Sequence, residues 1–379
     1  MTSTTTNYTK VQAELIAFIN AEVLESEDSG LDIDTPLLAI GILDSLAMVS
    51  LIARIEDAFG VRVPDNAVTP DNFQSIAAIA RMVDLIQETN VESSTVENSK
   101  DPYIKSLTDS LKMLESTGIT RHNLQLPQQQ GELHYLQVTG NTDYSYVFLP
   151  GVGNPSSSWG NLLQILNGEQ TAIAIDLLGF GLSHIANDSP NYADNIQAVL
   201  TLLETQEIPQ PWVLVGSSAG AIIGAEISRL KPDSVKALVI TGFGFIQNPT
   251  TWWEYLMNLS ESPKKFMEAA YYRSPKLTKS LRLLIDGVLC RPAYQSFLNE
   301  GGFEFMQSCF EDIKVPTLIV AGEEDQIIPK ADVIKLSEKI PNAKLDWLAR
   351  CGHFPPSEQP EELLFLMQHF PEHNCTSSY

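Results

Sequence analysis

The sequence is poor in cysteine and in basic side chains. Its 379 residues include only 4 cysteines, and 47 acidic residues outnumber 24 lysines and arginines, which gives a formal net charge of −23. The scattered cysteines form no metal-ligand pair and are too few for a disulfide scaffold, so we predict reduced thiols, no metal site and a reducing compartment. The acidic balance argues against direct binding to nucleic acid or to anionic membranes, because both require a basic surface.

The sequence also lacks long uncharged apolar runs. No run reaches the length of a membrane-spanning helix, and Met1–Lys10 is polar and rich in threonine, unlike a signal peptide. We therefore expect a cytoplasmic protein that does not interact with a membrane.

The length and the composition predict two domains. The hydrophobic fraction of 44% and the charged fraction of 19% are those of an ordinary globular protein. A chain of 379 residues is also longer than one typical core requires. Residues 89–111 contain few apolar residues and show no periodicity, which predicts a flexible linker. We expect a small domain at residues 8–88 and a larger one at residues 112–372.

Before the linker, apolar residues recur at helical spacing, as at Val11 and Leu15, and predict a small helical bundle. A long acidic loop, residues 25–43, joins the first two helices. The motif Gly-Ile-Leu-Asp-Ser-Leu at residues 41–46 opens the second helix. Ser45 is thus expected at a helix amino-terminus, where unpaired N–H groups and the helix dipole favour an anionic group. An ordinary helix cap is the simpler interpretation of the motif alone.

Residues 10–88 resemble an acyl or peptidyl carrier protein. The resemblance rests on that motif, on the acidic balance and on Val-Pro-Asp-Asn-Ala-Val-Thr-Pro-Asp-Asn-Phe at residues 63–73. It implies an all-α four-helix bundle in which Ser45 carries a covalent 4′-phosphopantetheine, making the chain a phosphoprotein. It also implies two partners: a phosphopantetheinyl transferase that attaches the arm, and an acyl-loading ligase or synthase that charges it.

After the linker, short apolar runs alternate with helical stretches. Five such runs occur, at residues 146–149, 172–175, 213–215, 237–240 and 317–320. A strand that is buried on both faces has no polar side, so the pattern predicts an α/β domain with a mostly parallel central sheet. For any single run, a buried helix segment is the alternative.

The pentapeptide Gly-Ser-Ser-Ala-Gly at residues 216–220 lies between one of these runs and a helical stretch. A strand, a tight turn and a helix in this order are what a nucleophile elbow requires. The small neighbours of the central serine permit the turn that exposes its hydroxyl. We predict that Ser218, rather than Ser217, is a nucleophile.

Residues 112–370 resemble the α/β-hydrolase superfamily, because further motifs of that family follow in its order. Leu-Pro-Gly-Val-Gly-Asn at residues 149–154 matches the oxyanion loop, with proline where histidine is common. Residues 176–183 match the turn Asp-x-x-Gly-x-Gly-x-Ser after the next strand. The resemblance implies that the backbone N–H groups of Val152 and Ala219 bind an oxyanion.

The same resemblance implies a base and an acid that complete a triad with Ser218. His353 lies in the late Gly-His loop, and Asp325 follows the last apolar run, where the family places the acid that orients the imidazole. Glu323 and Glu324 are expected to be only solvated. The other histidines are expected on the surface or in packing: His122, His134, His184, His369 and His373.

The family also inserts a helical cap, expected here at about residues 245–310. Its aromatic side chains suit an apolar acyl chain, although each ring could equally pack the cap onto the core. A serine at the elbow disfavours dehalogenase and epoxide hydrolase chemistry, which uses aspartate, and predicts a thioesterase-like serine hydrolase.

The leading hypothesis is a carrier-thioesterase didomain of polyketide or nonribosomal peptide biosynthesis, in secondary metabolism. Ser218 would attack an acyl thioester carried on Ser45, and the acyl group would be hydrolysed or transferred. Two alternatives stay open. One is a tailoring hydrolase, acyltransferase or cyclase that leaves the thioester intact, and the other is a carrier scaffold with a non-catalytic hydrolase fold.

Overall fold

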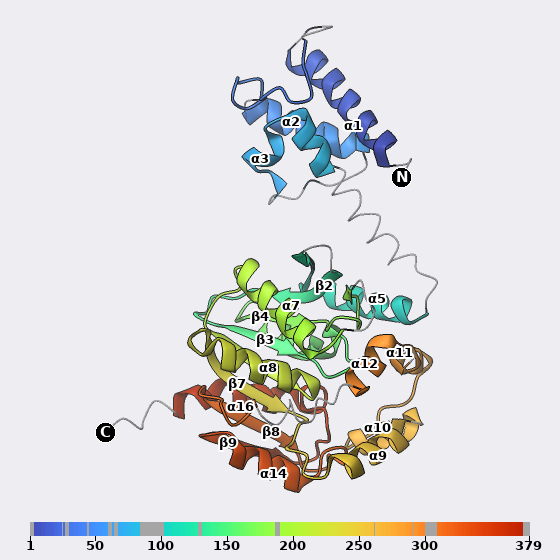
Figure 1. Cartoon of the computed structure of the whole chain (residues 1–379), viewed down its shortest axis with the longest axis vertical. Helices are drawn as coiled ribbons and strands as arrows, with labels where there is room; N and C mark the ends of the chain where they lie inside the picture. Colours follow the sequence, from blue (N-terminus) through green and yellow to red (C-terminus); the bar gives the residue numbers. More distant parts are fainter. Residues whose placement is uncertain are drawn as a thin grey trace, which may run out of the picture. The chain divides into compact units, whose positions relative to one another are not determined.

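The computed structural model (Figure 1) describes residues 4–24, 26, 30–43, 45–59, 63, 67–83, 102–127, 131–185, 190–260, 262–289, 291–299 and 309–373. The chain divides into two compact units, Met1–Ser99 and Lys100–Tyr379. None of the helices in the described residues is both long and apolar enough to span a membrane.

The N-terminal unit is built from helices and loops in its described residues. Its elements are α1 (Thr4–Phe18), the π-helical turn η1 (Ile19–Val23), α2 (Ser45–Phe59), α3 (Pro70–Phe73) and a helical segment at residues 76–83. Apolar side chains at helical spacing, among them Leu15, Leu51 and Ile79, form one buried cluster. The unit is all-α, as predicted from the periodicity, and the four-helix bundle itself stays a prediction.

The second unit contains a nine-stranded sheet. Its strands are β1 (Thr120–Gln125), β2 (Gly131–Val138), β3 (Ser145–Leu149), β4 (Thr171–Ile175), β5 (His184–Ile185), β6 (Trp212–Ser217), β7 (Val235–Thr241), β8 (Thr317–Gly322) and β9 (Ala343–Leu348). The order is β1-β2-β4-β3-β6-β7-β8-β9, with β5 paired to β2. From β4 to β9 all neighbours are parallel, whereas β2 runs antiparallel to β1, β4 and β5.

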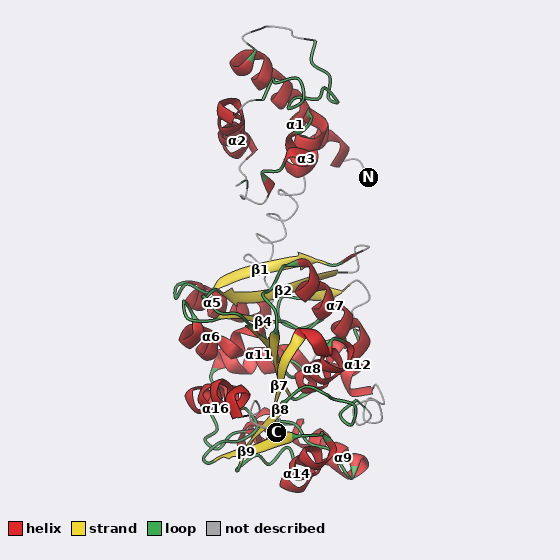
Figure 2. Cartoon of the chain, turned by 90° about the vertical axis from the view of Figure 1, so that its left-hand side faces the viewer, coloured by secondary structure: helices red, strands yellow, loops and turns green. Residues whose placement is uncertain are grey.

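Helices cover both faces of this sheet. Successive side chains of a strand point to opposite faces, so each central strand contributes to two buried clusters. Val147 and Leu149 of β3 belong to one buried cluster, together with α7 (Tyr192–Thr205) and α8 (Ala219–Leu230). Tyr146 and Phe148 belong to the other cluster. Figure 2 shows α7 and α8 on one side of the sheet and α6 and α16 on the other. The second cluster includes side chains of α5 (Pro102–Glu115), α6 (Gly160–Leu166) and α16 (Pro360–His373).

Helix α5 corrects the predicted linker. The segment 102–111 was assigned to the flexible linker 89–111, but it forms most of this helix. Tyr103, Leu107 and Leu111 are buried, with exposures of 3%, 1% and 0%. Their spacing of four residues places them on one helix face, which joins a buried cluster of the second unit. The second unit thus begins before residue 112. The helix was not predicted because polar residues separate the three buried apolar ones.

The residues described between β7 and β8, where the cap was expected, include four helices. They are α9 (Pro249–Ser260), α10 (Pro263–Ala270), α11 (Lys279–Leu289) and α12 (Pro292–Asn299). The remaining elements are η4 (Ser156–Trp159), η5 (Pro232–Ser234), α14 (Lys330–Lys339) and α15 (Pro355–Glu358).

Candidate active site

Ser218 lies in a strained turn between β6 and α8. Its backbone has φ 51° and ψ −117°, which is unusual for a residue with a side chain. The flanking glycines make this turn possible. A Cβ on Gly216 would collide with the carbonyl oxygen of Gly220, and one on Gly220 would collide with the carbonyl oxygen of Leu149. The predicted strand, tight turn and helix are therefore present around Ser218, which is half-buried.

The predicted oxyanion loop packs directly against this turn. A Cβ on Gly151 would lie 3.1 Å from the Cβ of Ser218, so the loop and the serine are in contact. The Asn154 N–H donates to the Gly151 carbonyl at 3.1 Å and closes the loop. Within the described part of the chain, the N–H groups of Val152 and Ala219 have no acceptor. Both residues line the same pocket as Ser218.

Asp325 and His353 form a hydrogen-bonded pair. Asp325 Oδ2 lies 2.9 Å from His353 Nδ1, and the two side chains are only 7% and 5% exposed. The other carboxylate oxygen, Oδ1, accepts the N–H groups of Ile327 at 2.7 Å and Ile328 at 3.2 Å. The backbone thereby fixes the carboxylate, and the carboxylate fixes the imidazole with Nδ1 as the donor and Nε2 available.

The sequence did not point to Gly242, which positions the imidazole from the other side. A Cβ on this glycine would lie 3.2 Å from Cε1 and 3.3 Å from Nε2 of His353, so the ring packs against the end of β7. The neighbouring Thr241 carbonyl accepts the Ser218 N–H at 3.0 Å. A glycine with φ +56° after a buried strand is the signal that could have found it.

Two glutamates hold the loop before His353. Glu324 Oε2 accepts the Cys351 N–H at 2.9 Å, so this side chain is not merely solvated, as was expected. Glu358 Oε1 accepts the Gly352 N–H at 2.8 Å. Its Oε2 accepts the Tyr272 N–H at 2.8 Å, which ties the loop to the cap region. Burial raises the pKa of Glu358, partly offset by these backbone hydrogen bonds.

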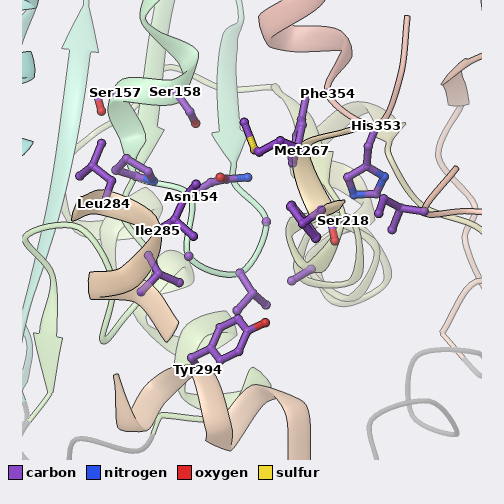
Figure 3. Close-up of a pocket in the computed structure, with 18 of the residues that line it drawn as sticks. Asn154, Ser157, Ser158, Ser218, Met267, Leu284, Ile285, Tyr294, His353 and Phe354 are labelled. Carbon is purple, nitrogen blue, oxygen red and sulfur yellow. The ribbon is translucent and has the colours of Figure 1, made fainter. Parts of the chain in front are cut away.

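Ser218 and His353 line one pocket of about 830 Å³ (Figure 3). Within the described part of the chain the Ser218 hydroxyl makes no hydrogen bond to His353, as is common at such sites before substrate binds. No Asp, Glu, Lys or Arg occurs among the described residues that line the pocket. Its wall is mainly apolar, with an aromatic group formed by Phe243, Trp252, Trp253, Phe266, Tyr271 and Phe354.

A second imidazole–carboxylate pair lies in the core, away from the pocket lining. His134 Nδ1 is 2.7 Å from Asp176 Oδ2, and both side chains are fully buried. Asp176 also accepts the N–H groups of Ser156 and Leu182, while Ser183 Oγ donates to its carbonyl at 2.7 Å. The predicted turn at residues 176–183 is thus a structural cross-link. His134, expected in packing or on the surface, is its buried partner.

Ser45 is the first residue of α2, as predicted. The side chains of Asp44 and Ser45 lie outside the described residues. The preceding Leu43 is buried at 4% exposure and anchors the loop that leads into the helix. The first turn of α2 contains no acidic side chain, so its N–H groups are suited to a phosphodiester. The helix therefore fits a phosphopantetheine attached at its start.

The comparisons with known proteins identify both units of the chain. A model of the alpha/beta hydrolase family matches residues 146–364, and a model of the phosphopantetheine attachment site matches residues 14–83. The chain belongs to the alpha/beta hydrolase family, with a carrier domain for covalent 4′-phosphopantetheine ahead of the hydrolase. The predicted fusion is confirmed. Such a carrier domain implies a phosphopantetheinyl transferase and an acyl-loading partner.

Individual relatives are also hydrolases. The chain is 28% identical over 265 residues to 2-hydroxy-6-oxononadienedioate/2-hydroxy-6-oxononatrienedioate hydrolase 2 of Pseudomonas putida, covering 64% of this chain and 92% of the relative. It is 26% identical over 261 residues to the corresponding hydrolase of Paraburkholderia phymatum, covering 63% and 90%. Carboxylesterase CesB of Bacillus subtilis shares the fold, with a TM-score of 0.57, 18% identity, and coverage of 70% of this chain and 98% of that one.

Proposed function

We propose that this protein is a serine hydrolase that releases or transfers the acyl group of a thioester carried on the Ser45 phosphopantetheine. Its setting would be polyketide or nonribosomal peptide-type biosynthesis. Ser218 is the nucleophile, His353 the base, and Asp325 the group that orients and stabilises the imidazole. Val152 and Ala219 donate their N–H groups to the oxyanion.

The first half of the reaction acylates the serine. Ser218 Oγ attacks the thioester carbonyl carbon while His353 Nε2 takes the hydroxyl proton. Asp325 stabilises the imidazolium, and the N–H groups of Val152 and Ala219 stabilise the tetrahedral oxyanion. As the carbon–sulfur bond breaks, His353 returns the proton to the departing thiolate, leaving a free thiol and an acyl-Ser218 ester.

The second half removes the acyl group. His353 Nε2 takes a proton from water, or from an acceptor hydroxyl or amine, which attacks the ester carbonyl. The same two N–H groups stabilise the second oxyanion. His353 then returns the proton to Ser218 Oγ as the ester bond breaks, and the serine is restored. Water gives an acid, whereas another nucleophile gives a transferred or cyclised product.

The observation that carries this proposal is the 2.9 Å bond between His353 and Asp325 beside a pocket that also contains the strained Ser218. The uncharged lining supports an apolar, neutral acyl group, because an ionised group buried there would lack a partner. This supports an acyl thioester over the doubly charged substrates that the names of the bacterial relatives imply. Such dioates would need cationic side chains, and the described lining residues include no Lys or Arg.

Intact-protein mass spectrometry tests the proposal. The full chain is loaded on Ser45 with an acyl-4′-phosphopantetheine, which a phosphopantetheinyl transferase transfers from acyl-coenzyme A, and the wild type is compared with Ser218→Ala. We expect the wild type to lose the acyl mass, whereas the variant retains it. The matched control is Ser217→Ala, which removes a neighbouring hydroxyl that does not line the pocket. A changed mass on the arm would indicate tailoring instead, and equal behaviour of wild type and Ser218→Ala would indicate a scaffold.

A further inference from the structure

The pocket has two chemically different arms. The aromatic arm is the group of six rings defined above. The polar arm is formed by the turn after α5, by η4 and by α6, through Ser116, Thr117, Ser157, Ser158, Asn161 and Gln164. Figure 3 shows Asn154 of the oxyanion loop between Ser157 and Ser158 on one side and Ser218 and His353 on the other.

The aromatic arm lies on the side of the imidazole. Trp252 Nε1 donates to the Ile327 carbonyl at 2.8 Å, two residues from Asp325. The ring of Tyr271 lies 5.0 Å from that of Phe354, the neighbour of His353. A substrate whose carbonyl reaches Ser218 can therefore extend into rings on one side and into the polar arm on the other.

The polar arm leads to solvent. Ser157 and Ser158 are half-buried, Asn161 and Gln164 are exposed, and Met113 at the same mouth is 74% exposed. The pocket lining also includes apolar side chains of α11, among them Leu284 and Ile285, which Figure 3 shows on the same side as Ser157 and Ser158. This arm thus combines hydroxyl and amide groups with apolar side chains.

Four of the six polar side chains of this arm are available to a ligand, whereas the hydroxyl groups of Ser116 and Thr117 donate to the backbone carbonyls of Met113 and Leu114. Within the described residues, the side chains of Ser157, Ser158, Asn161 and Gln164 make no hydrogen bond to another residue. Side-chain hydroxyls and amides can both donate and accept, so they suit a ligand with amide groups. They carry no charge, which matches a neutral ligand.

We propose that the polar arm binds the pantetheine chain of the carried thioester and thereby presents the thioester carbonyl to Ser218. The inference rests on the proposed function. Pantetheine alternates short methylene segments with two amides and ends in hydroxyl-bearing carbons. Its amides can bond to the serine, asparagine and glutamine side chains, while its methylene segments contact α11. The acyl group then lies in the aromatic arm, and the covalent attachment lies outside the mouth.

Binding to the full chain carrying Ser45→Ala, which has no arm of its own, tests the assignment. The probe is S-hexylpantetheine, a thioether that Ser218 cannot cleave, and the comparison ligand is S-hexyl-N-acetylcysteamine, which lacks the outer half of the arm. Both affinities are measured by calorimetry. In Asn161→Leu/Gln164→Leu we expect the affinity for S-hexylpantetheine to fall about tenfold relative to the shorter ligand. Gln197→Leu, an exposed glutamine on α7 outside the pocket, is the matched control and should change neither affinity.

A second measurement separates this inference from the proposed function. Ser45→Ala is given hexanoyl-pantetheine and hexanoyl-N-acetylcysteamine, and kcat/KM is compared. A preference for the longer thioester that disappears in Asn161→Leu/Gln164→Leu supports the polar arm. Cleavage of both thioesters with equal kcat/KM, or an unchanged affinity ratio in the double variant, would contradict pantetheine binding by the polar arm. The proposed serine hydrolase activity would not be affected by either result. If neither thioester is cleaved although S-hexylpantetheine binds through the arm, the proposed function fails and the binding site stands.

Discussion

Two imidazole–carboxylate pairs in the hydrolase unit share one geometry. His134 and Asp176 lie 2.7 Å apart, and His353 and Asp325 lie 2.9 Å apart, in each case through Nδ1 and Oδ2. They differ in what surrounds the second ring nitrogen. His134 Nε2 is buried and has no hydrogen-bond partner among the described residues, whereas the ring of His353 lines the pocket.

This difference shows that the pair alone does not make a catalytic site. The buried pair joins β2 to the turn after β4, and it holds the start of η4 through the Ser156 N–H. The pair at the pocket is held by backbone N–H groups and leaves one nitrogen open to a substrate. We therefore expect loss of the first pair to affect stability and loss of the second to affect turnover.

The largest expected effect is on turnover, in Asp325→Asn. The amide cannot stabilise an imidazolium and favours the wrong tautomer of His353, so kcat should fall about ten-thousandfold. The unfolding midpoint should stay close to that of the wild type. Steady-state kinetics with an acyl-N-acetylcysteamine thioester and urea unfolding measure the two quantities. A folded variant with normal kcat would show that Asp325 has no role in the reaction.

The next effect is on stability, in Asp176→Asn. Removing one partner leaves the fully buried His134 without its carboxylate, and we expect the free energy of unfolding to fall by about 3–5 kcal/mol. The number of folded molecules is measured with a fluorophosphonate that labels the active serine. Turnover per labelled molecule should stay close to the wild-type value. An unchanged unfolding curve would show that the buried pair does not stabilise the fold.

A smaller loss of turnover is expected in Gly242→Ala. The new methyl group would collide with the His353 carbonyl oxygen at 2.6 Å and crowd the ring, which displaces the imidazole, and φ +56° is unfavourable for alanine. A shift of this kind typically costs about a hundredfold in kcat. The serine should still be labelled by a fluorophosphonate, although more slowly. Wild-type kcat in this variant would mean that the ring has room to move, and the packing argument would fail.

The smallest expected effect is a pH dependence of the stability that the buried Asp176 carboxylate contributes. Burial acts to raise the pKa of Asp176, but His134 and the N–H groups of Leu182 and Ser156 hold it below the ordinary value. The folded chain then binds fewer protons than the unfolded chain. The stability from this carboxylate is present above the unfolded pKa and lost as the pH falls through the folded pKa. The difference in unfolding free energy between wild type and Asp176→Asn should therefore shrink below about pH 4. A difference that stays constant with pH would contradict an Asp176 carboxylate whose pKa is lowered in the folded chain.

The sequence predicted the parts of the fold in which local pattern and burial agree. All five apolar runs became parallel strands, since strands buried on both faces carry a continuous apolar signal. Strands β1, β2, β5 and β9 were missed. Strands β1 and β9 are only partly buried, and polar residues interrupt the apolar pattern of β2 although it is buried. Helix α5 was missed because polar residues, which are typical of a linker, separate its three buried residues.

The candidate site follows the same division. Ser218, Asp325 and His353 were placed by motif and chain order, and the structure brings the last two into a hydrogen bond. The roles of Gly242, Glu324 and the polar arm could not be predicted. Each depends on contacts between segments distant in sequence, such as the end of β7 against the loop of His353. No single window of sequence contains both partners of such a contact.

Helix α5 also limits how this protein can be recombined. It contributes Tyr103 to the core and Ser110 and Met113 to the pocket lining, although it lies well before the segment that defines the hydrolase family. A chimaera with a different carrier must therefore be joined before Pro102. A junction at residue 112 would cut α5 and separate its buried residues Tyr103, Leu107 and Leu111 from the hydrolase unit.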